Sequence, residues 1–167
     1  MWEPSAERGS AESGVWIRPL NEVRDTGPIL GFLPDLFETN FPGFVCDTEF
    51  AAFKRRQLHE AALDPGQVVL VAEDSLGVCG FIWLGIETEY RRQARGEVRA
   101  IYVHPRVRNQ GVGRRLMEHG EAFLVAFGCQ SVRLMVTASN AAACRLYDEL
   151  GYAVTRHQME KRLSEGP

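Results

Sequence analysis

The sequence predicts one mixed α/β domain, in which a single layer of sheet is covered by helices on both faces. The 167 residues are enough for one hydrophobic core and too few for two ordinary domains. Along the chain, β-rich runs alternate with runs at helical spacing, and no repeat or linker interrupts them. We expect a flexible tail over 1–14, a domain over 15–163 and a short tail over 164–167.

The N-terminal part of the domain predicts a strand and a helix. Residues 15–18 form a short β-rich run. Asn21 or Asp25 would cap the helix, which would extend toward Phe37. Two prolines are expected to break this helix up: Pro28 and Pro34.

A second helix is predicted between Asp47 or Thr48, as its N-cap, and the Asp-Pro-Gly turn at 64–66. Its apolar side chains recur near a helical period: Phe50, Phe53, Leu58 and Ala61. This second helix therefore has an amphipathic pattern, which is typical of a helix that packs on a sheet.

The rest of the chain predicts strands and helices in turn. In order, these are a hairpin over 67–73 and 78–87, a strand over 97–103, a helix over 113–127, a strand over 131–136, a helix over 140–150 and a final strand or strand pair over 152–163. Gly128 and Gly151 would end the two helices. The strand over 97–103 is mostly apolar, which is expected when both faces of a sheet are covered.

The composition is that of an ordinary globular protein, with 45% hydrophobic and 25% charged residues. The apolar runs are too short to span a bilayer, and the N-terminus lacks the apolar region of a secretory signal. The four cysteines and four histidines show neither C-x-x-C nor metal-ligand spacing. We therefore expect a cytoplasmic protein with free thiols, no metal site and no membrane association.

The net charge of −3 is unevenly distributed. Residues 91–115 hold eight arginines and one acid, whereas residues 1–90 hold fifteen acidic and six basic residues. A cationic island in an acidic protein suits a compact polyanionic ligand and argues against nucleic acid, which needs a broad basic face. Three of these arginines are expected only to solvate the surface: Arg91, Arg92 and Arg95.

The glycine-rich stretch "HPRVRNQGVGRRL" opens the helix over 113–127 and contains four of these eight arginines. It is not a P-loop, because it has neither the lysine nor the hydroxyl of that motif. It is not a dinucleotide fingerprint either, because Leu116 stands where the third glycine should be. What remains is Arg-x-x-Gly-x-Gly, formed by Arg108, Gly111 and Gly113. The N–H groups of such a loop converge on one point, and a pyrophosphate fits there.

Two motifs together resemble the GNAT superfamily of acetyl-CoA-dependent N-acetyltransferases. One is this loop after a strand that ends in "VHP"; the other is Asn-x-x-Ala-x-x-Leu-Tyr, from Asn140 to Tyr147, followed by Gly-Tyr. The similarity is close over 97–163, and earlier segments agree in order only. It implies a mixed, mostly antiparallel sheet, in which the strands before the loop and after the helix splay apart around coenzyme A.

The resemblance also assigns cofactor-binding residues. Ile101 and Val103 would offer backbone groups to the pantetheine arm of acetyl-CoA. The N–H groups of the loop would hold the pyrophosphate: Arg108, Asn109, Gln110, Gly111, Val112, Gly113 and Arg114. Asn140 would contact the arm, with helix capping as an alternative role.

The implied reaction is a direct acetyl transfer to an amine, with Tyr147 as the catalytic acid. An alkyl ammonium has a pKa of about 10.4, so a group or a water must take its proton before attack. The leaving thiolate, whose thiol has a pKa of about 8.5, departs better when it is protonated. Tyr147 matches the family's acid position, and a core aromatic side chain is the alternative interpretation.

The catalytic base is left open. Glu97 matches the glutamate of some family members, and the two-residue period places it on one face with Ile101 and Val103. An exposed charge paired with Arg99 is the alternative. Two other carboxylates are candidates for the base, Glu87 and Glu89. A chain of water molecules without a single base is a further alternative.

The sequence does not identify the acceptor, beyond a primary amine of a small molecule or a peptide. A non-catalytic acyl-CoA-binding regulatory module is the alternative function, and a nucleotide-phosphate binder of another fold is a further one. The segment 28–44 is rich in phenylalanine and leucine. It indicates a wall of the acceptor pocket or core or, alternatively, a surface for a homodimer or another partner.

Overall fold

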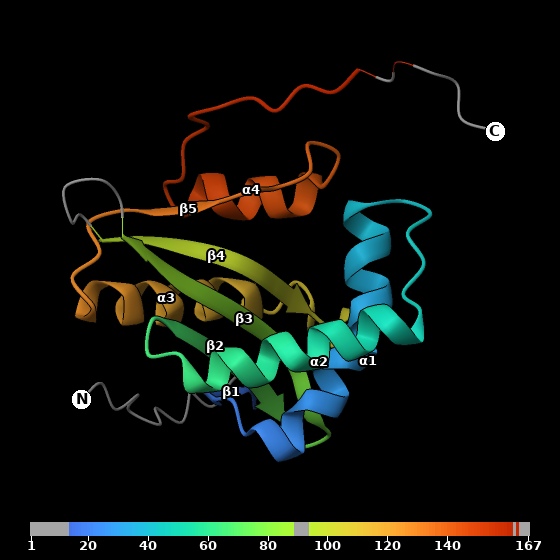
Figure 1. The fold of residues 1–167 in the computed structure, drawn as a ribbon. Coiled ribbons are helices and arrows are strands. Elements are labelled where there is room, and N and C mark those ends of the chain that lie inside the picture. Colours follow the sequence, from blue (N-terminus) through green and yellow to red (C-terminus); the bar gives the residue numbers. More distant parts are fainter. Residues whose placement is uncertain (1–13, 89–93, 162, 164–167) are drawn as a thin grey trace.

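The computed structural model describes residues 14–88, 94–161 and 163, and its centre is a five-stranded sheet (Figure 1). The strands are β1 (Trp16–Pro19), β2 (Gln67–Asp74), β3 (Gly77–Thr88), β4 (Ala94–Val103) and β5 (Val132–Leu134). They lie in chain order across the sheet. All neighbouring strands are antiparallel except β4 and β5, which are parallel.

Helices cover both faces of this sheet, as the sequence predicts (Figure 1). They are α1 (Glu22–Asn40), α2 (Thr48–Leu63), α3 (Val112–Ala126) and α4 (Ala141–Glu149), with a short 3-10 turn η1 (Pro105–Val107) before α3. The predicted mixed α/β fold is therefore confirmed, and so are the hairpin and the helices that follow it.

Two hydrophobic cores lie on opposite faces of the sheet. Because side chains alternate along a strand, Leu70 and Ile82 point toward α3, whereas Val71 and Phe81 point toward α1 and α2. On the first face Leu116 of α3 is fully buried. On the other face the sheet is covered by two buried helix residues: Ile29 and Leu58.

Helix α1 differs from its prediction, because it runs unbroken through Pro28 and Pro34. Each proline removes one backbone donor. Ile29 nevertheless packs in the core on this face of the sheet, and Leu33 is also buried; this packing holds the helix together. Asn21 is its N-cap and accepts from the backbone N–H of Arg24 at 3.1 Å.

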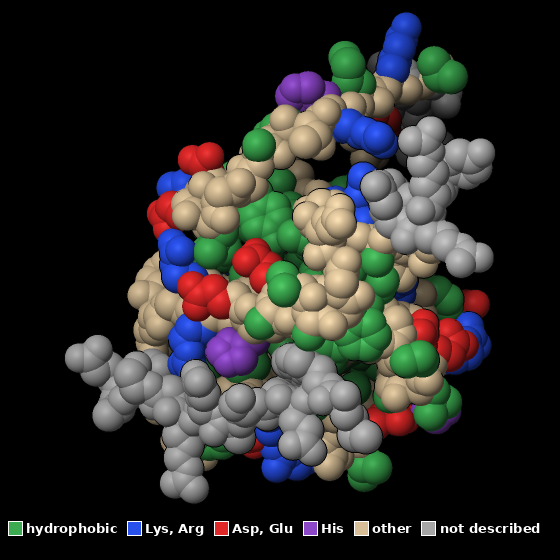
Figure 2. All heavy atoms as spheres, turned by 90° about the vertical axis from the view of Figure 1, so that its left-hand side faces the viewer, with side chains coloured by type: hydrophobic (Ala, Val, Ile, Leu, Met, Phe, Trp, Pro, Cys, Tyr) green, Lys and Arg blue, Asp and Glu red, His purple; other side chains and the backbone are tan. Residues whose placement is uncertain are grey.

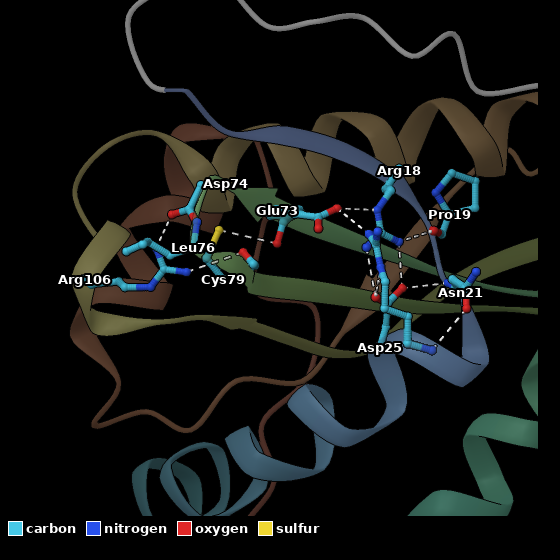
Figure 3. Close-up of polar contacts among 12 residues, drawn as sticks. Arg18, Pro19, Asn21, Asp25, Glu73, Asp74, Leu76, Cys79 and Arg106 are labelled. Carbon is cyan, nitrogen blue, oxygen red and sulfur yellow. Dashed lines mark hydrogen bonds and ion pairs between the residues drawn. The ribbon is translucent and has the colours of Figure 1, made fainter.

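Asp25 does not cap the helix. It is fully buried and forms an ion pair with Arg18 of β1, at 2.6 and 2.9 Å (Figure 3). The backbone N–H of Asn21 donates to the same carboxylate at 2.7 Å. Glu73 of β2 binds Arg18 and Arg24 at 2.7 and 2.6 Å. These ion pairs join β1, α1 and β2.

The prediction of a final strand over 152–163 is wrong for the described residues, since 152–161 contain no strand. Tyr152 is anchored, because its hydroxyl donates to Glu121 of α3 at 2.7 Å. Beyond it the chain stands away from the body of the molecule (Figures 1 and 2). Val154 and Met159 are almost fully exposed among polar neighbours. The segment therefore buries too little apolar surface to order a strand on the sheet.

Among the described residues, no helix is long and apolar enough to cross a membrane. In the same part of the chain no group of three or more His, Cys, Asp or Glu side chains could hold a metal ion. On the face in Figure 2, acidic and basic side chains lie beside one another along one flank.

Candidate active site

The sheet opens between β4 and β5, as the resemblance implies. The two strands pair only where Gly96–Val98 lies beside Val132–Leu134. Strand β4 continues to Val103, whereas the residues after Leu134 are not in a strand. Beyond Val98, therefore, no strand of the described chain pairs with β4 on its β5 side.

A bulge in β4 lies at the start of this opening. Trp83 and Leu84 of β3 are consecutive, but their partners in β4 are Ala100 and Val98, so Arg99 is an extra residue. Bulges increase the local twist of a strand. The bulge thus bends β4 where its pairing with β5 ends.

The bulge also changes which side chains share a face. Val98, Ile101 and Val103 pack on the α3 side, whereas Ala100 and Tyr102 pack on the α1 side. Glu97 neighbours Val98 and so faces α1. The expectation that Glu97 shares a face with Ile101 and Val103 is therefore wrong, because the simple two-residue period fails at the extra residue.

The loop after β4 leads into α3 through two residues in the left-handed region. Gly111, the N-cap of α3, has φ 75°, and Asn109 has φ 61°. Gly111 has no side chain that could cap the helix, and the N–H groups of a helix's first turn have no acceptor within the helix. Those amides, together with the helix dipole, suit an anion.

A glycine is needed at position 113 for a different reason, which is close packing. A Cβ at this position would lie 3.3 Å from Leu146 of α4 and 3.7 Å from Val103 of β4. The glycine therefore allows α3 to start close against α4 and the end of β4. Val112, between the two glycines, is buried in the core.

The four arginines around this loop are all bound within the protein. Arg106 forms an ion pair with Asp74 (Figure 3), and Arg114 pairs with Glu149 at 2.5 Å. Arg115 donates to the carbonyl oxygen of Val15 at 2.9 Å. An anion placed at this loop would therefore meet its backbone amides, because these arginines are bound to neighbouring elements. Arg91 and Arg92 lie outside the described residues.

Arg108 links the loop to both β4 and α1. Its Nε donates to the carbonyl oxygen of Val103 at 2.9 Å, and its Nη2 donates to Asp35 at 3.0 Å. Asp35 also accepts from the Tyr102 hydroxyl at 2.7 Å. Burial, together with this hydrogen bond, raises the pKa of Tyr102 to about 12. Arg108 therefore occupies the Val103 carbonyl that the resemblance assigns to the pantetheine arm. Gln110 donates from its amide to the carbonyl oxygen of Arg106 at 3.2 Å.

Helix α4 supplies the two other predicted residues. Asn140 is its N-cap and accepts from the backbone N–H of Ala143 at 3.2 Å, so the capping role is present. The Tyr147 ring is buried in the α3-side core, and burial raises its pKa to about 12. Within the described chain its hydroxyl has no hydrogen-bond partner, yet that oxygen is not sealed from solvent. A neutral phenol with an accessible proton is what a catalytic acid requires.

The candidate bases belong to a polar cluster on the α1 face. Arg133 of β5 donates to Glu87 at 2.6 Å and to Glu97 at 3.3 Å. Arg99 lies 3.7 Å from Glu97 and donates to Gln67 at 2.5 Å. Arg133 and Gln67 were not predicted as site residues. Only the pairing of β4 with β5 shows that Arg133 lies opposite Glu97. Glu89 lies outside the described residues.

The second half of α1 contacts both sides of the opening. Asp35 holds Arg108 in the loop after β4. One turn further, Asn40 accepts from the Thr137 hydroxyl at 3.3 and 3.4 Å, and Thr137 follows β5. The end of α1 therefore stands at the mouth of the gap between β4 and β5.

This open sheet, with an uncapped helix start after β4 and a tyrosine on α4, defines the class of protein. The sequence profile of the Acetyltransferase (GNAT) family matches residues 31–152. The chain belongs to this family, as the resemblance indicates.

Among curated relatives, the mycothiol acetyltransferase of Pseudarthrobacter chlorophenolicus is 30% identical over 163 residues, which cover 95% of this chain and 48% of the relative. That of Thermobispora bispora is 39% identical over 101 residues, covering 59% and 34%. The chain thus spans less than half the length of these relatives.

Solved structures share the fold. The glucosamine-6-phosphate N-acetyltransferase of Arabidopsis thaliana superposes with a TM-score of 0.65 at 21% identity, covering 90% of this chain and 99% of that one. AAC(6')-Iy, in complex with the bisubstrate analog CoA-S-monomethyl-acetylneamine, gives 0.69 at 18% identity, covering 90% and 98%. A transcriptional regulator from Bacillus halodurans gives 0.72 at 18% identity, covering 89% and 99%.

Proposed function

We propose that this protein is an N-acetyltransferase that moves an acetyl group from acetyl-CoA directly to a primary amine of a small molecule or peptide. The observation that carries the proposal is the gap between β4 and β5, which ends at the uncapped start of α3. A thioester carrier has an extended arm and a diphosphate, and the gap and the helix start match these two parts.

Acetyl-CoA would bind along β4. Ile101 and Val103 would present backbone groups to the arm, which requires Arg108 to release the Val103 carbonyl. The amides from Arg108 to Arg114 would hold the diphosphate. Asn140 would orient the arm from the start of α4 while it caps the helix.

Proton transfer would involve two sides of the gap. An amine bound on the α1 face would lose its proton to Glu97, or through a water to Glu87 or Glu97. Nitrogen attack on the thioester carbonyl forms the amide bond and breaks the carbon–sulfur bond. Tyr147 would donate its proton to the departing thiolate. The thiol chemistry and the free cysteines fit the cytoplasmic location that we propose.

The proposal is tested by titrating coenzyme A by calorimetry and by following thiol release from acetyl-CoA over a panel of amines. We expect saturable binding and amine-dependent thiol release. Binding without transfer to any amine would favour a non-catalytic acyl-CoA module. Absence of binding at millimolar coenzyme A would reject the assignment altogether.

A further inference from the structure

Arg108 joins three parts of the molecule at the end of β4: the loop, the strand and α1. Its Nε donates to the carbonyl oxygen of Val103 at 2.9 Å, and its Nη2 donates to Asp35 Oδ2 at 3.0 Å. The Tyr102 hydroxyl donates to the same carboxylate oxygen at 2.7 Å. We call this set of contacts among Val103, Arg108, Asp35 and Tyr102 the Arg108 bridge. It restrains a long side chain that would otherwise sample many rotamers.

The Val103 carbonyl points into the gap between β4 and β5. The backbone N–H of the next residue, His104, donates to the carbonyl oxygen of Cys79 at 2.8 Å, on the β3 side of the strand. In an antiparallel pair, residues that bond to the partner strand alternate with residues whose N–H and C=O point away from it. The backbone groups of Val103 therefore point away from β3. Arg108 thus meets this carbonyl from the side on which the arm of acetyl-CoA would lie.

Tyr102 holds the Arg108 bridge to the rigid part of the fold. Only 6% of Tyr102 is exposed, and its ring stacks on that of Phe32 in α1, with centroids 4.8 Å apart. The guanidinium carbon of Arg108 lies 5.8 Å from the centroid of the Tyr102 ring. Aromatic faces attract cations within about 6 Å. A buried phenol thus fixes Asp35, and Asp35 and the ring together fix Arg108.

We propose that Asp35 is a positioning residue that sets the affinity of the protein for the pantetheine arm, because it holds Arg108 on the carbonyl that the arm must take. The inference rests on the proposed function, since it concerns the entry of acetyl-CoA into the same gap. When the arm binds, the hydrogen bond from Arg108 to Val103 breaks, and an N–H of the arm donates to the freed oxygen. Asp35 opposes this exchange. The diphosphate would meet the backbone amides of the loop, so Asp35 has little influence on it.

The test compares coenzyme A with 3'-phospho-ADP, which is coenzyme A without its arm, in titrations followed by NMR chemical shifts. Asp35→Ala should lower the Kd of coenzyme A by about two- to fivefold, which is the size of the effect of an exposed ion pair. The Kd of 3'-phospho-ADP should be unchanged. Tyr102→Phe, which removes the hydroxyl that fixes Asp35, should change the Kd of coenzyme A in the same direction by less. A merely structural role of Asp35 would weaken both ligands instead.

Glu149→Gln is the matched control. Glu149 pairs with Arg114 near the start of α3 at 2.5 Å, so this change also releases an arginine beside the loop. It leaves the contacts of Val103 in place and should keep the wild-type ratio of the two Kd values. If Asp35→Ala also keeps that ratio, or binds coenzyme A more weakly, the inference is overturned while the proposed function stands. If the wild type binds no coenzyme A, the two are rejected together.

NMR of the arginine side chains observes the Arg108 bridge directly, without acetyl transfer. The Nε–H signal of Arg108 can be assigned by its absence in Arg108→Lys. In the free wild type this proton should exchange slowly with water, and in Asp35→Ala it should exchange faster. Coenzyme A should accelerate the exchange in the wild type, because the arm displaces the group, whereas 3'-phospho-ADP should not. Equal exchange in the wild type and Asp35→Ala would overturn the inference.

Discussion

Tyr147 is the residue on which the proposed chemistry depends most directly. Because burial raises its pKa to about 12, the phenol keeps its proton over the whole working pH range. Tyr147→Phe should lower kcat by about 10²-fold or more, the usual size of a lost proton transfer. The affinity for coenzyme A should stay within about threefold, which calorimetry would measure.

Tyr152→Phe is the control for this change. Tyr152 packs beside Tyr147, with ring centroids 5.8 Å apart, but its hydroxyl donates to Glu121. Its loss should reduce stability slightly and leave kcat near the wild-type value. Equal kcat in wild type and Tyr147→Phe would remove Tyr147 from the mechanism.

Glu97 and Glu87 can be separated by the same assay, although both bind Arg133. Glu97→Gln keeps the size of the side chain and removes the base, so kcat should fall by about 10²-fold. Glu87→Gln should have a small effect. The reverse order would assign the base to Glu87, and two small effects would favour a water chain.

At the scale of secondary structure, most elements could be predicted from local signals. Asn21, Asp47 and Asn140 all cap helices by the expected bonds. The left-handed glycine at 128 ends α3 as expected. Such signals are short-range, so a sequence contains them completely.

Features that depend on partners distant in the chain could not be predicted in this way. The bulge at Arg99 is defined only by the pairing of β4 with β3. The pairing of Arg133 with Glu97 needs the register of β5. Continuity of α1 through Pro28 and Pro34 depends on what the helix packs against. The anion loop was predicted from its glycines, but the partners of its arginines come from elsewhere in the chain.

Helix α3 approaches the sheet closely at Gly120, and this contact gives a stability prediction. A Cβ there would lie 2.7 Å from Leu84 Cδ1 and 3.2 Å from Ile82 Cδ1, both on buried side chains. Gly120→Ala should therefore lower the free energy of unfolding by about 1–2 kcal/mol, because overpacking outweighs the gain in helix propensity. Urea denaturation would measure it.

Gly31→Ala is the matched comparison in α1, since nothing lies within 4 Å of its added Cβ. Replacing an exposed helical glycine by alanine should raise the free energy of unfolding by about 0.5–1 kcal/mol. If Gly120→Ala were also stabilising, the close packing of α3 on β3 would not limit the size of the residue at position 120.

For the molecule as a whole, the ion pairs of Asp25 and Glu73 with Arg18 join three elements at one edge of the sheet (Figure 3). Burial alone would raise the pKa of Asp25, but the hydrogen bonds from Arg18 and from the Asn21 backbone outweigh it and lower the pKa. The ionised form therefore stabilises the fold above a pH of about 4, the ordinary value for an aspartate. This contribution is lost as the pH falls through the lowered pKa of the folded state.

Asp25→Asn tests this directly. Removing one partner of a buried pair typically costs about 3–5 kcal/mol, and we expect about 3 because Arg18 is partly accessible. The difference in unfolding free energy between wild type and variant should be full at pH 7 and shrink below a pH of about 4. A difference that did not change with pH would mean that the carboxylate charge is unimportant there.

Arg99, the extra residue in β4, matters for how this chain could evolve by mutation. Because Val98 and Ala100 lie on opposite faces, a chain that lacked Arg99 would keep regular alternation and every apolar side chain in its present core. The strand would straighten, however, and the residues that follow Leu134 could then extend its pairing with β5. Deletion of Arg99 would therefore leave the domain able to fold but would narrow the gap between β4 and β5, where we propose that the ligand binds. A variant of this chain could thus fold normally and still lose its ability to bind the ligand.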